Sequence, residues 1–266
     1  EFLPEKIRNK YGLEGLQQAI EHIHYPTDKN QLYSARKRLI FDEFFMFIYN
    51  IRNLKDKNTE IHNRHILVEP KEVKTLINNL PYELTNAQKR TWEEIKRDIS
   101  STKVMNRLIQ GDVGSGKTII AFFALITAAL NNGQGAMMAP TEVLARQHYD
   151  NLIELIKEHN INVNPVVLVG SMTAKEKREA YKVIESGDAD IIIGTHALIQ
   201  EKVNYNNLTM VVTDEQHRFG VRQREAISEK GEHPHIMVMS ATPIPRTLAI
   251  IMLSLIHISE PTRHAQ

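Results

Sequence analysis

Short apolar runs alternate with longer segments of helical periodicity through most of the chain after about residue 84. The runs are RLIQ, GAMMAP, PVVLVG, ADIIIGT, LTMVVTDE and HIMVMSAT, and helices are predicted from Lys117, Glu142 and Thr173. Such alternation indicates a parallel sheet covered by helices, so the predicted fold class is α/β.

The first 80 residues have a different pattern, which predicts a small α-helical segment ahead of the sheet. Two short helices are expected before Pro26, broken at Tyr11–Gly12, because glycine and proline interrupt helical patterns. Ser34–Tyr49 begins with a capping serine and has enough apolar residues for a buried helix. The charged stretch Arg52–Arg64 is expected to be a turn or a poorly ordered link.

Composition adds exclusions rather than a function. The 266 residues carry a formal net charge of +1, so no global basic field indicates a nucleic-acid partner, and any such binding must come from local charges. Cysteine is absent, which excludes disulfide scaffolds and thiolate zinc sites. The apolar runs Ile119–Leu130 and Leu248–Ile258 are too short to span a membrane, and the N-terminus lacks a signal-peptide pattern. We therefore expect a cytoplasmic protein with no membrane partner.

The sequence from Gly111 to Thr118, GDVGSGKT, fits the phosphate-binding pattern G-x-x-x-x-G-K-[ST] between a predicted strand and a predicted helix. Glycines let the backbone wrap so that its N–H groups face phosphate oxygens, and the helix N-terminus adds a favourable dipole. Lys117 is expected to reach the β- and γ-phosphates of ATP, and Thr118 to bind Mg²⁺. The predicted ATP-binding residues of this segment are Gly111, Asp112, Val113, Gly114, Ser115, Gly116, Lys117 and Thr118.

Two adjacent acids, Asp214 and Glu215, follow the apolar run LTMVV. P-loop enzymes use an acid at the end of a neighbouring strand to hold Mg²⁺, and a second carboxylate to activate water. The predicted catalytic residues are therefore Lys117, Asp214 and Glu215, with Thr118 and Asp214 as magnesium ligands. A salt-bridged strand end is the alternative for the two acids, and it is disfavoured by the P-loop.

A histidine metal site is a further alternative. His217 follows the two acids, and other histidines occur in HIH at 22–24 and HPH at 233–235. These clusters lack the i,i+4 spacing of helical zinc ligands and stand beside turn prolines, so metal binding by histidine is disfavoured.

Taken in order, the motifs resemble those of the first motor domain of superfamily-two helicases, which implies a RecA-like P-loop domain. LPYELTNAQKR resembles the family's Q motif, and GDVGSGKT its motif I. Ala139–His148 is similar to motif Ia, Gly194–Leu198 to motif Ib, DEQH at 214–217 to motif II, and SAT at 240–242 to motif III. Expected domains are a helical linker region (1–80), the ATP-binding domain (81–252) and an atypical, possibly foreign tail (253–266).

The runs DEQHRFGVRQR and SATPIPRTLA are similar to the RecG branch of bacterial branched-DNA helicases, and the helices before residue 80 resemble that branch's linker. Gln216 favours this branch over transcription-repair coupling translocases, and DEQH in place of DEAD disfavours RNA helicases. A non-catalytic nucleotide-binding adaptor is the third alternative, which intact Lys117, Asp214 and Glu215 disfavour. The resemblance also implies an upstream wedge domain and a downstream second motor domain that this chain does not contain.

The resemblance implies roles for individual residues. Adenine would lie near Gln88 and Tyr82, and His217 would couple the nucleotide site to Ser240 and Thr242, with a buried hydrogen-bonded histidine as the alternative for His217. The implied cofactors are ATP and Mg²⁺.

DNA would run along the loops that follow MMAP and IIIGT, where strands end and helices begin. The implied partner is branched or forked DNA, bound by a chain that we expect to act as a monomer. Arg218, Phe219, Arg222 and Arg224 would help couple ATP to DNA, or form a solvated helix face. The predicted DNA contacts are Thr141, Arg146, Thr195 and His196.

Overall fold

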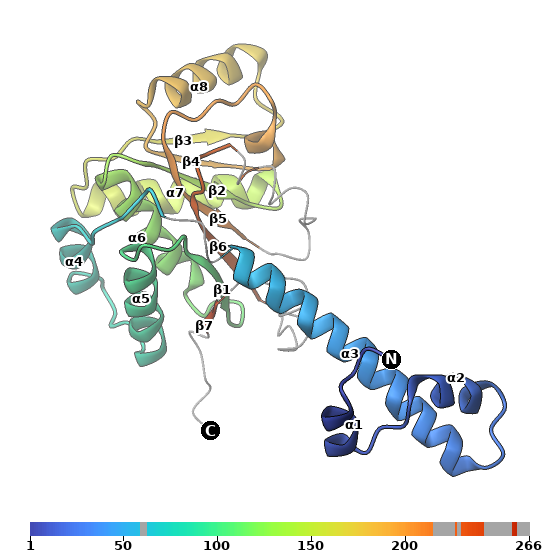
Figure 1. The fold of residues 1–266 in the computed structure, drawn as a ribbon. Helices are drawn as coiled ribbons and strands as arrows, with labels where there is room; N and C mark the ends of the chain where they lie inside the picture. Colours follow the sequence, from blue (N-terminus) through green and yellow to red (C-terminus); the bar gives the residue numbers. More distant parts are fainter. Residues whose placement is uncertain (59–62, 215–226, 228–229, 242–256, 260–266) are drawn as a thin grey trace. The chain divides into compact units, whose positions relative to one another are not determined.

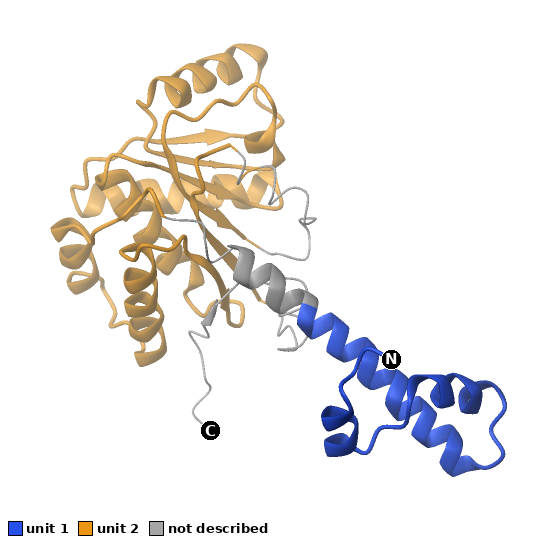
Figure 2. Cartoon of the chain, in the orientation of Figure 1, with its two compact units in different colours: residues 1–57 blue, residues 58–266 orange. Residues whose placement is uncertain are grey.

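The first 58 residues contain helices and connecting loops, and a helix-covered sheet forms most of the rest of the chain (Figure 1). The structure is a computed structural model that describes residues 1–58, 63–214, 227, 230–241 and 257–259. The chain divides into two compact units, Glu1–Lys57 and Asn58–Gln266, coloured separately in Figure 2.

A buried arginine of the third helix binds the segments that precede the first and second helices. The Arg38 guanidinium donates to the carboxylate of Asp42 (Nε to Oδ1, 2.9 Å), to the carbonyl of Glu14 (Nη1 to O, 2.6 Å) and to the carboxylate of Glu1. Hydrogen bonds from Arg38 and from a backbone amide lower the pKa of Glu1 to about 2. A fully buried guanidinium requires such partners, because an unpaired buried charge is strongly destabilising. The helices are α1 (Glu5–Tyr11), α2 (Leu16–His24) and α3 (Lys29–Asn58).

The third helix is longer than the sequence pattern suggested. It begins at Lys29 rather than Ser34 and continues to Asn58, well beyond Tyr49. The prediction of a turn or link from Arg52 is therefore wrong as far as Asn58. The helix continues because Arg, Leu and Lys are good helix formers, and a charged stretch without glycine or proline can extend a helix.

All strand pairings in the described part of the second unit are parallel, in the order β3-β4-β2-β5-β6-β1-β7. The six predicted strands are confirmed as β1 to β6, and three residues of the expected tail add a strand beside β1. The strands are β1 (Asn106–Gln110), β2 (Gln134–Met138), β3 (Pro165–Leu168), β4 (Ile191–Gly194), β5 (Leu208–Thr213), β6 (His235–Ser240) and β7 (His257–Ser259).

Helices cover both faces of this sheet, as predicted for an α/β fold. Because alternate strand residues point to opposite faces, Met137 packs with one cluster and Met138 with the other. The first cluster includes residues of α4, α5, α6 and α7, and the second includes residues of α8 and of the 3₁₀ turn η1. The elements are α4 (Lys71–Asn78), α5 (Asn86–Ile99), α6 (Lys117–Leu130), α7 (Glu142–Glu158), α8 (Ala174–Ser186) and η1 (His196–Ile199).

The division between the two units falls at residues 57 and 58, earlier than the boundary expected near residue 80. The reason is that α4 buries Val73 and Leu76 completely within the core that also contains the central helix α6. Among the described residues, no helix is long and apolar enough to cross a membrane.

His235, from the HPH sequence, is buried, and each of its two ring nitrogens makes a hydrogen bond to the backbone. The Met105 amide donates to Nδ1 (2.9 Å), which leaves Nε2 to donate to the carbonyl of His65 (2.8 Å). This arrangement requires the neutral ring, because a protonated Nδ1 could not accept. Burial lowers the pKa of His235 to about 4.

Acid should therefore destabilise the second unit through His235. Below its unfolded-state pKa of about 6.5, His235 binds a proton in the unfolded chain, whereas in the folded chain it stays neutral until about pH 4. This difference in pKa lowers the free energy of unfolding by about 3 kcal/mol at low pH. Stability from this group is thus complete above pH 6.5 and is lost as the pH falls toward 4. Urea unfolding at several pH values should show a shallower pH dependence for His235→Gln than for the unsubstituted chain.

His233→Asn provides the control, since His233 is exposed and asparagine tolerates its φ of +58°. This variant should keep the original pH dependence. Equal pH dependence of all three proteins would show that His235 does not contribute.

Candidate functional site at the carboxyl edge of the sheet

The predicted phosphate-binding segment forms the turn between β1 and α6, which confirms its structural context. Gly114 and Gly116 have φ values of +82° and +79°, the left-handed region in which glycine avoids Cβ strain. Gly116 is also the N-cap of α6, so the free amides of the first helical turn face the loop. Such a loop can surround an anion with backbone N–H groups. The predicted residues Gly111, Asp112, Val113, Gly114, Ser115 and Gly116 lie in this loop, and Lys117 and Thr118 are the first residues of α6.

Lys117 folds back over its own loop. Its ammonium donates to the carbonyls of Gly111 (2.5 Å) and Asp112 (2.7 Å), and lies 3.4 Å from Ser115 Oγ. The positive charge is thereby held at the turn. A phosphate could replace these carbonyl groups as the hydrogen-bond partner of the ammonium.

Gln88 ties the start of α5 to the phosphate loop. Its side-chain oxygen accepts from the Thr85 amide (2.8 Å), while the Thr85 hydroxyl accepts from the Gln88 amide (3.2 Å), a reciprocal capping box. The other end of the Gln88 amide group donates to the carbonyl of Ser115 (2.8 Å). Gln88 therefore contacts the phosphate loop directly, while its role in binding adenine stays a prediction.

A cavity of about 270 Å³ adjoins the loop. Gly116 and Thr118 line it on the loop side, Tyr82 lies on the approach to α5, and Asn151 comes from α7. The Tyr82 ring is about half exposed, so its face is accessible to a planar group.

Asp214 follows β5, which lies one strand away from β1 with β6 between them. Its backbone amide donates to the carbonyl of Met138, and its carboxylate oxygen Oδ2 lies 2.9 Å from Nε2 of His148. His148 projects from the buried side of α7 and is only 7% exposed, so the carboxylate is held in one direction. Thr118 and Asp214 are both oxygen donors at one edge of the sheet, which suits the preferences of Mg²⁺.

Ser240 joins the loop to the end of β6. Its carbonyl accepts from the Gly111 amide (3.2 Å), continuing the register in which Gln110 pairs with Ser240. Several predicted residues after β5 and β6 lie outside the described residues, so the structure does not test them. They are Glu215, Gln216, His217, Arg218, Phe219, Arg222, Arg224 and Thr242.

The predicted nucleic-acid contacts lie at the carboxyl ends of β2 and β4. The Thr141 hydroxyl caps α7 by accepting from the Leu144 amide (3.3 Å). Arg146 is exposed and reaches Ser171 Oγ (Nη2 to Oγ, 3.4 Å) in the loop after β3.

Thr195 and His196 differ in accessibility. Thr195 is 3% exposed, and its hydroxyl has no hydrogen-bond partner among the described residues. The side chain is therefore buried, whereas the sequence predicted a hydroxyl exposed to solvent. Its amide donates to the carbonyl of Leu168, and the residue is the N-cap of η1. His196, the first residue of η1, is exposed.

Sequence reasoning missed His148 and Asn151 as site residues. His148 stands among Ala145, Leu152 and Ile156 on the buried stripe of α7, where a histidine needs a polar partner. The acid Asp214 was the signal available, since α7 follows β2, the strand predicted to end at the same edge. Asn151 carried no comparable signal.

The comparisons with known proteins agree with this architecture. Residues 85–251 match the DEAD/DEAH box helicase family. The chain therefore belongs to the DEAD/DEAH box helicase family. Within it, the chain is RecG-like: it is 43% identical over 261 residues to the ATP-dependent DNA helicase RecG of Bacillus subtilis, and 44% identical over 260 residues to that of Synechocystis. These alignments cover 97% of this chain but 38% and 31% of the relatives, so the chain spans about a third of their length.

Solved structures extend the comparison. A structure of RecG bound to a three-way DNA junction matches the whole chain with a TM-score of 0.81 and 38% identity, and the match covers 36% of that chain. The helicase MrfA bound to DNA covers 75% of this chain and 31% of its own, with a TM-score of 0.57 at 17% identity, which shows a shared fold alone.

The two left-handed glycines of the loop should differ in their tolerance of a side chain. A Cβ on Gly114 would meet no atom within 4 Å, whereas a Cβ on Gly116 would lie 2.3 Å from Nε2 of Gln88. Gly114→Ala should therefore cost only the left-handed strain of about 1–2 kcal/mol. Gly116→Ala should lose more stability, because it also displaces Gln88 from Ser115.

Urea unfolding of the two variants measures this difference. The double variant Gly116→Ala/Gln88→Ala should recover part of the loss relative to Gly116→Ala alone. Equal stabilities of the two glycine variants would contradict the proposed contact.

Proposed function

We propose that this chain is the ATP-binding motor segment of a DNA helicase or translocase that acts on branched DNA, such as forks and Holliday junctions, in recombination and repair. The observation that carries the proposal is the phosphate loop with Lys117, lying at the same sheet edge as Asp214. Identity of 43–44% to DNA helicases named RecG supports DNA as the substrate class. The RecG structure bound to a three-way junction supports a branched substrate.

In this proposal the loop amides and Lys117 bind the phosphates of ATP. The ammonium of Lys117 leaves the carbonyls of Gly111 and Asp112 and pairs with phosphate oxygens, a stronger charge-assisted contact. The adenine occupies the neighbouring cavity against Tyr82, within reach of the Gln88 side.

Thr118 and Asp214 would hold Mg²⁺, which neutralises phosphate charge when bound. Two protein ligands are few for a metal, but Mg²⁺ at nucleotide sites takes its remaining ligands from phosphates and water. Glu215 would act as the base for the attacking water, and His217, Ser240 and Thr242 as coupling residues. The bond from Gly111 to Ser240 supports this coupling, since it joins the loop to the start of motif III.

DNA would cross the β2 and β4 ends of the same edge. Arg146 and His196 are the exposed side chains of the predicted set and would contact backbone phosphates. Thr141 and Thr195 would act mainly by fixing the first turns of α7 and η1. Binding of this kind tolerates any sequence and needs no large net charge. We further propose that the chain acts as a monomer.

A transcription-repair coupling translocase and an RNA helicase remain the alternative functions. Several RNA-acting or DEAD-box structures share the fold at 16–22% identity, which does not favour their substrates. A competition experiment separates the classes: a labelled DNA fork bound by the chain is displaced by unlabelled fork, linear duplex or structured RNA. The proposal expects the fork to compete best, and preferential displacement by RNA would contradict it.

Lys117→Ala should weaken ATP binding by about tenfold to a hundredfold, the effect of losing a hydrogen-bonded charge. Binding of a fluorescent ATP analogue in the presence of Mg²⁺ measures the change. Lys103→Ala is the matched control, because Lys103 is an exposed lysine of the same unit outside the loop. Equal affinity of Lys117→Ala and the control would refute the assignment of the phosphate site.

His148 should matter to Mg²⁺ through Asp214 rather than to ATP directly. His148→Leu keeps the buried volume but removes the contact at Oδ2, so the Mg²⁺ concentration needed for half-maximal ATP binding should rise about tenfold or more. His148→Gln keeps an N–H donor and should restore part of the effect.

ATP-analogue affinity in EDTA distinguishes positioning from a structural role. It should be the same in both His148 variants and in the unsubstituted chain. A uniform loss of affinity with and without Mg²⁺ would show that His148 serves only the packing of α7.

A further inference from the structure

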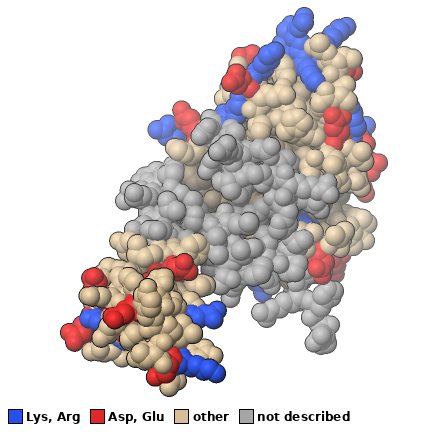
Figure 3. All heavy atoms as spheres, turned by 90° about the vertical axis from the view of Figure 1, so that its right-hand side faces the viewer, with Lys and Arg blue, Asp and Glu red and all other residues tan. Residues whose placement is uncertain are grey.

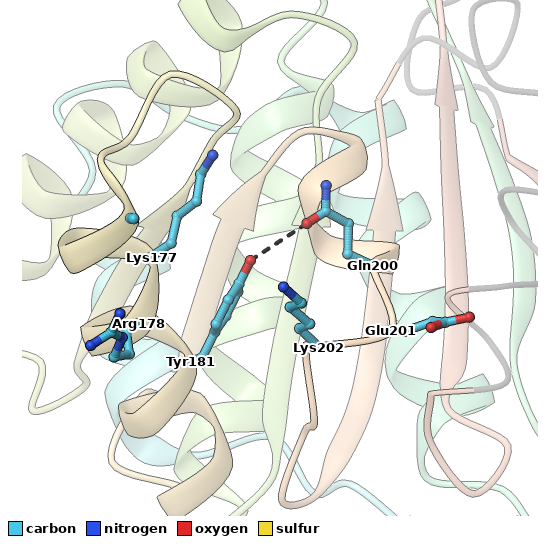
Figure 4. A pocket seen from close by; sticks show the side chains of 7 residues that line it. Lys177, Arg178, Tyr181, Gln200, Glu201 and Lys202 are labelled. Atoms are coloured by element: carbon cyan, nitrogen blue, oxygen red, sulfur yellow. Dashed lines mark hydrogen bonds between the residues drawn. The ribbon is translucent and has the colours of Figure 1, made fainter.

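A second cavity, of about 620 Å³, lies away from the phosphate loop, between α8 and the segment that follows η1 (Figure 4). Four residues at positions i, i+3, i+4 and i+7 of α8 form one wall, so a single helix face lines it. The other wall is the turn of residues 200–202, which is closed by the hydrogen bond from the Val203 amide to the carbonyl of Gln200. The polar and charged side chains that line the cavity are those of Lys177, Arg178, Tyr181, Gln200, Glu201 and Lys202.

The lining is predominantly cationic. Three cations, Lys177, Arg178 and Lys202, and one carboxylate, that of Glu201, line the cavity, which leaves a local charge of about +2 in a chain whose net charge is +1. Arg178 and Lys202 are exposed, and neither pairs with any residue in the part of the chain that the structure describes. Their charges are therefore available to an anionic ligand.

The walls are held in place by other groups. Lys177 donates to the carbonyl of Gly170 (2.5 Å), which fastens the first turn of α8 to the loop after β3. The Tyr181 hydroxyl points across the cavity to Oε1 of Gln200 at 3.5 Å, so one contact joins the two walls (Figure 4). Lys230 donates to the carbonyls of Gln200 and Val203 and fixes the second wall from below.

The position of the cavity links it to the proposed DNA path. Residues 200–202 directly follow η1, which begins at the exposed His196. The loop that Lys177 fastens also contains Ser171, the partner of Arg146. In Figure 3, Lys and Arg side chains gather at the top of the second unit, the end at which Figure 1 places α8.

We propose that this cavity binds backbone phosphates of a nucleic-acid strand, extending the path beyond Arg146 and His196. The inference rests on the proposed action on DNA. A polyanion fits better than a small metabolite, because the two free cations stand on an exposed rim where a single anion would be weakly held. Successive phosphates of one strand can engage several such cations and release counterions from each.

The test compares two double variants that remove the same charge from the same region. Arg178→Ala/Lys202→Ala removes the free cations of the cavity. Lys175→Ala/Lys182→Ala removes two exposed lysines of α8 that do not line it. Binding of a labelled DNA fork to the full chain is measured by fluorescence anisotropy between 50 and 300 mM salt, with ATP-analogue binding as the measure of an intact nucleotide site.

For the cavity variant, we expect about tenfold weaker DNA binding at about 0.1 M salt, and a plot of log K against log salt that is shallower by about 1.4–1.8, the contribution of two phosphate contacts. The control variant should change both quantities much less, and both variants should bind the ATP analogue normally.

Equal losses of DNA affinity in the two variants would contradict the cavity site and indicate that DNA binds a diffuse basic surface. Unchanged DNA binding in the cavity variant would overturn the cavity proposal but not the proposed function. Normal ATP-analogue binding with no fork binding by the unsubstituted chain would overturn the proposed function together with the cavity.

Discussion

The shared direction of the strands is the constraint on which the rest of the second unit depends. In a parallel sheet all strands end at the same edge, so the loops after β1, β2, β4, β5 and β6 lie along that edge. The order of strands then separates two regions of that edge. The phosphate loop and Asp214 follow β1 and β5, whereas Arg146 and His196 come after β2 and β4.

Small polar contacts fix the loops once the strands have placed them. The capping box of Gln88 and Thr85 begins α5, and the remaining donor of Gln88 reaches Ser115 in the phosphate loop. Ser240 accepts from Gly111 on the other side of the loop. The loop is thus held from two directions by groups whose positions are set by a helix cap and by strand register. Its conformation depends on both, which explains how a glycine-rich turn is kept in one arrangement.

Much of this could be predicted from the sequence because the determinants are local. Apolar runs such as IIIG specify buried strands, and GDVGSGKT specifies a loop between a strand and a helix irrespective of the surroundings. The rest depends on tertiary contacts. Periodicity cannot show that α4 packs beside α6, and the charges from Arg52 onward cannot show that α3 continues through them. Likewise, Thr195 reads as an exposed loop hydroxyl until its amide is seen to bond to Leu168.

One helix connects the two regions of the edge. Thr141 caps α7 at the proposed DNA side, and His148, two turns later, touches the carboxylate of Asp214. Seven residues of helix span about 10 Å and are stiff along the axis, because each turn is closed by backbone hydrogen bonds. The same helix thus begins in the region proposed for DNA and contacts the acid of the nucleotide site two turns later. The carboxylate of Asp214 is oriented by this helix, while its backbone is held by the sheet through the carbonyl of Met138.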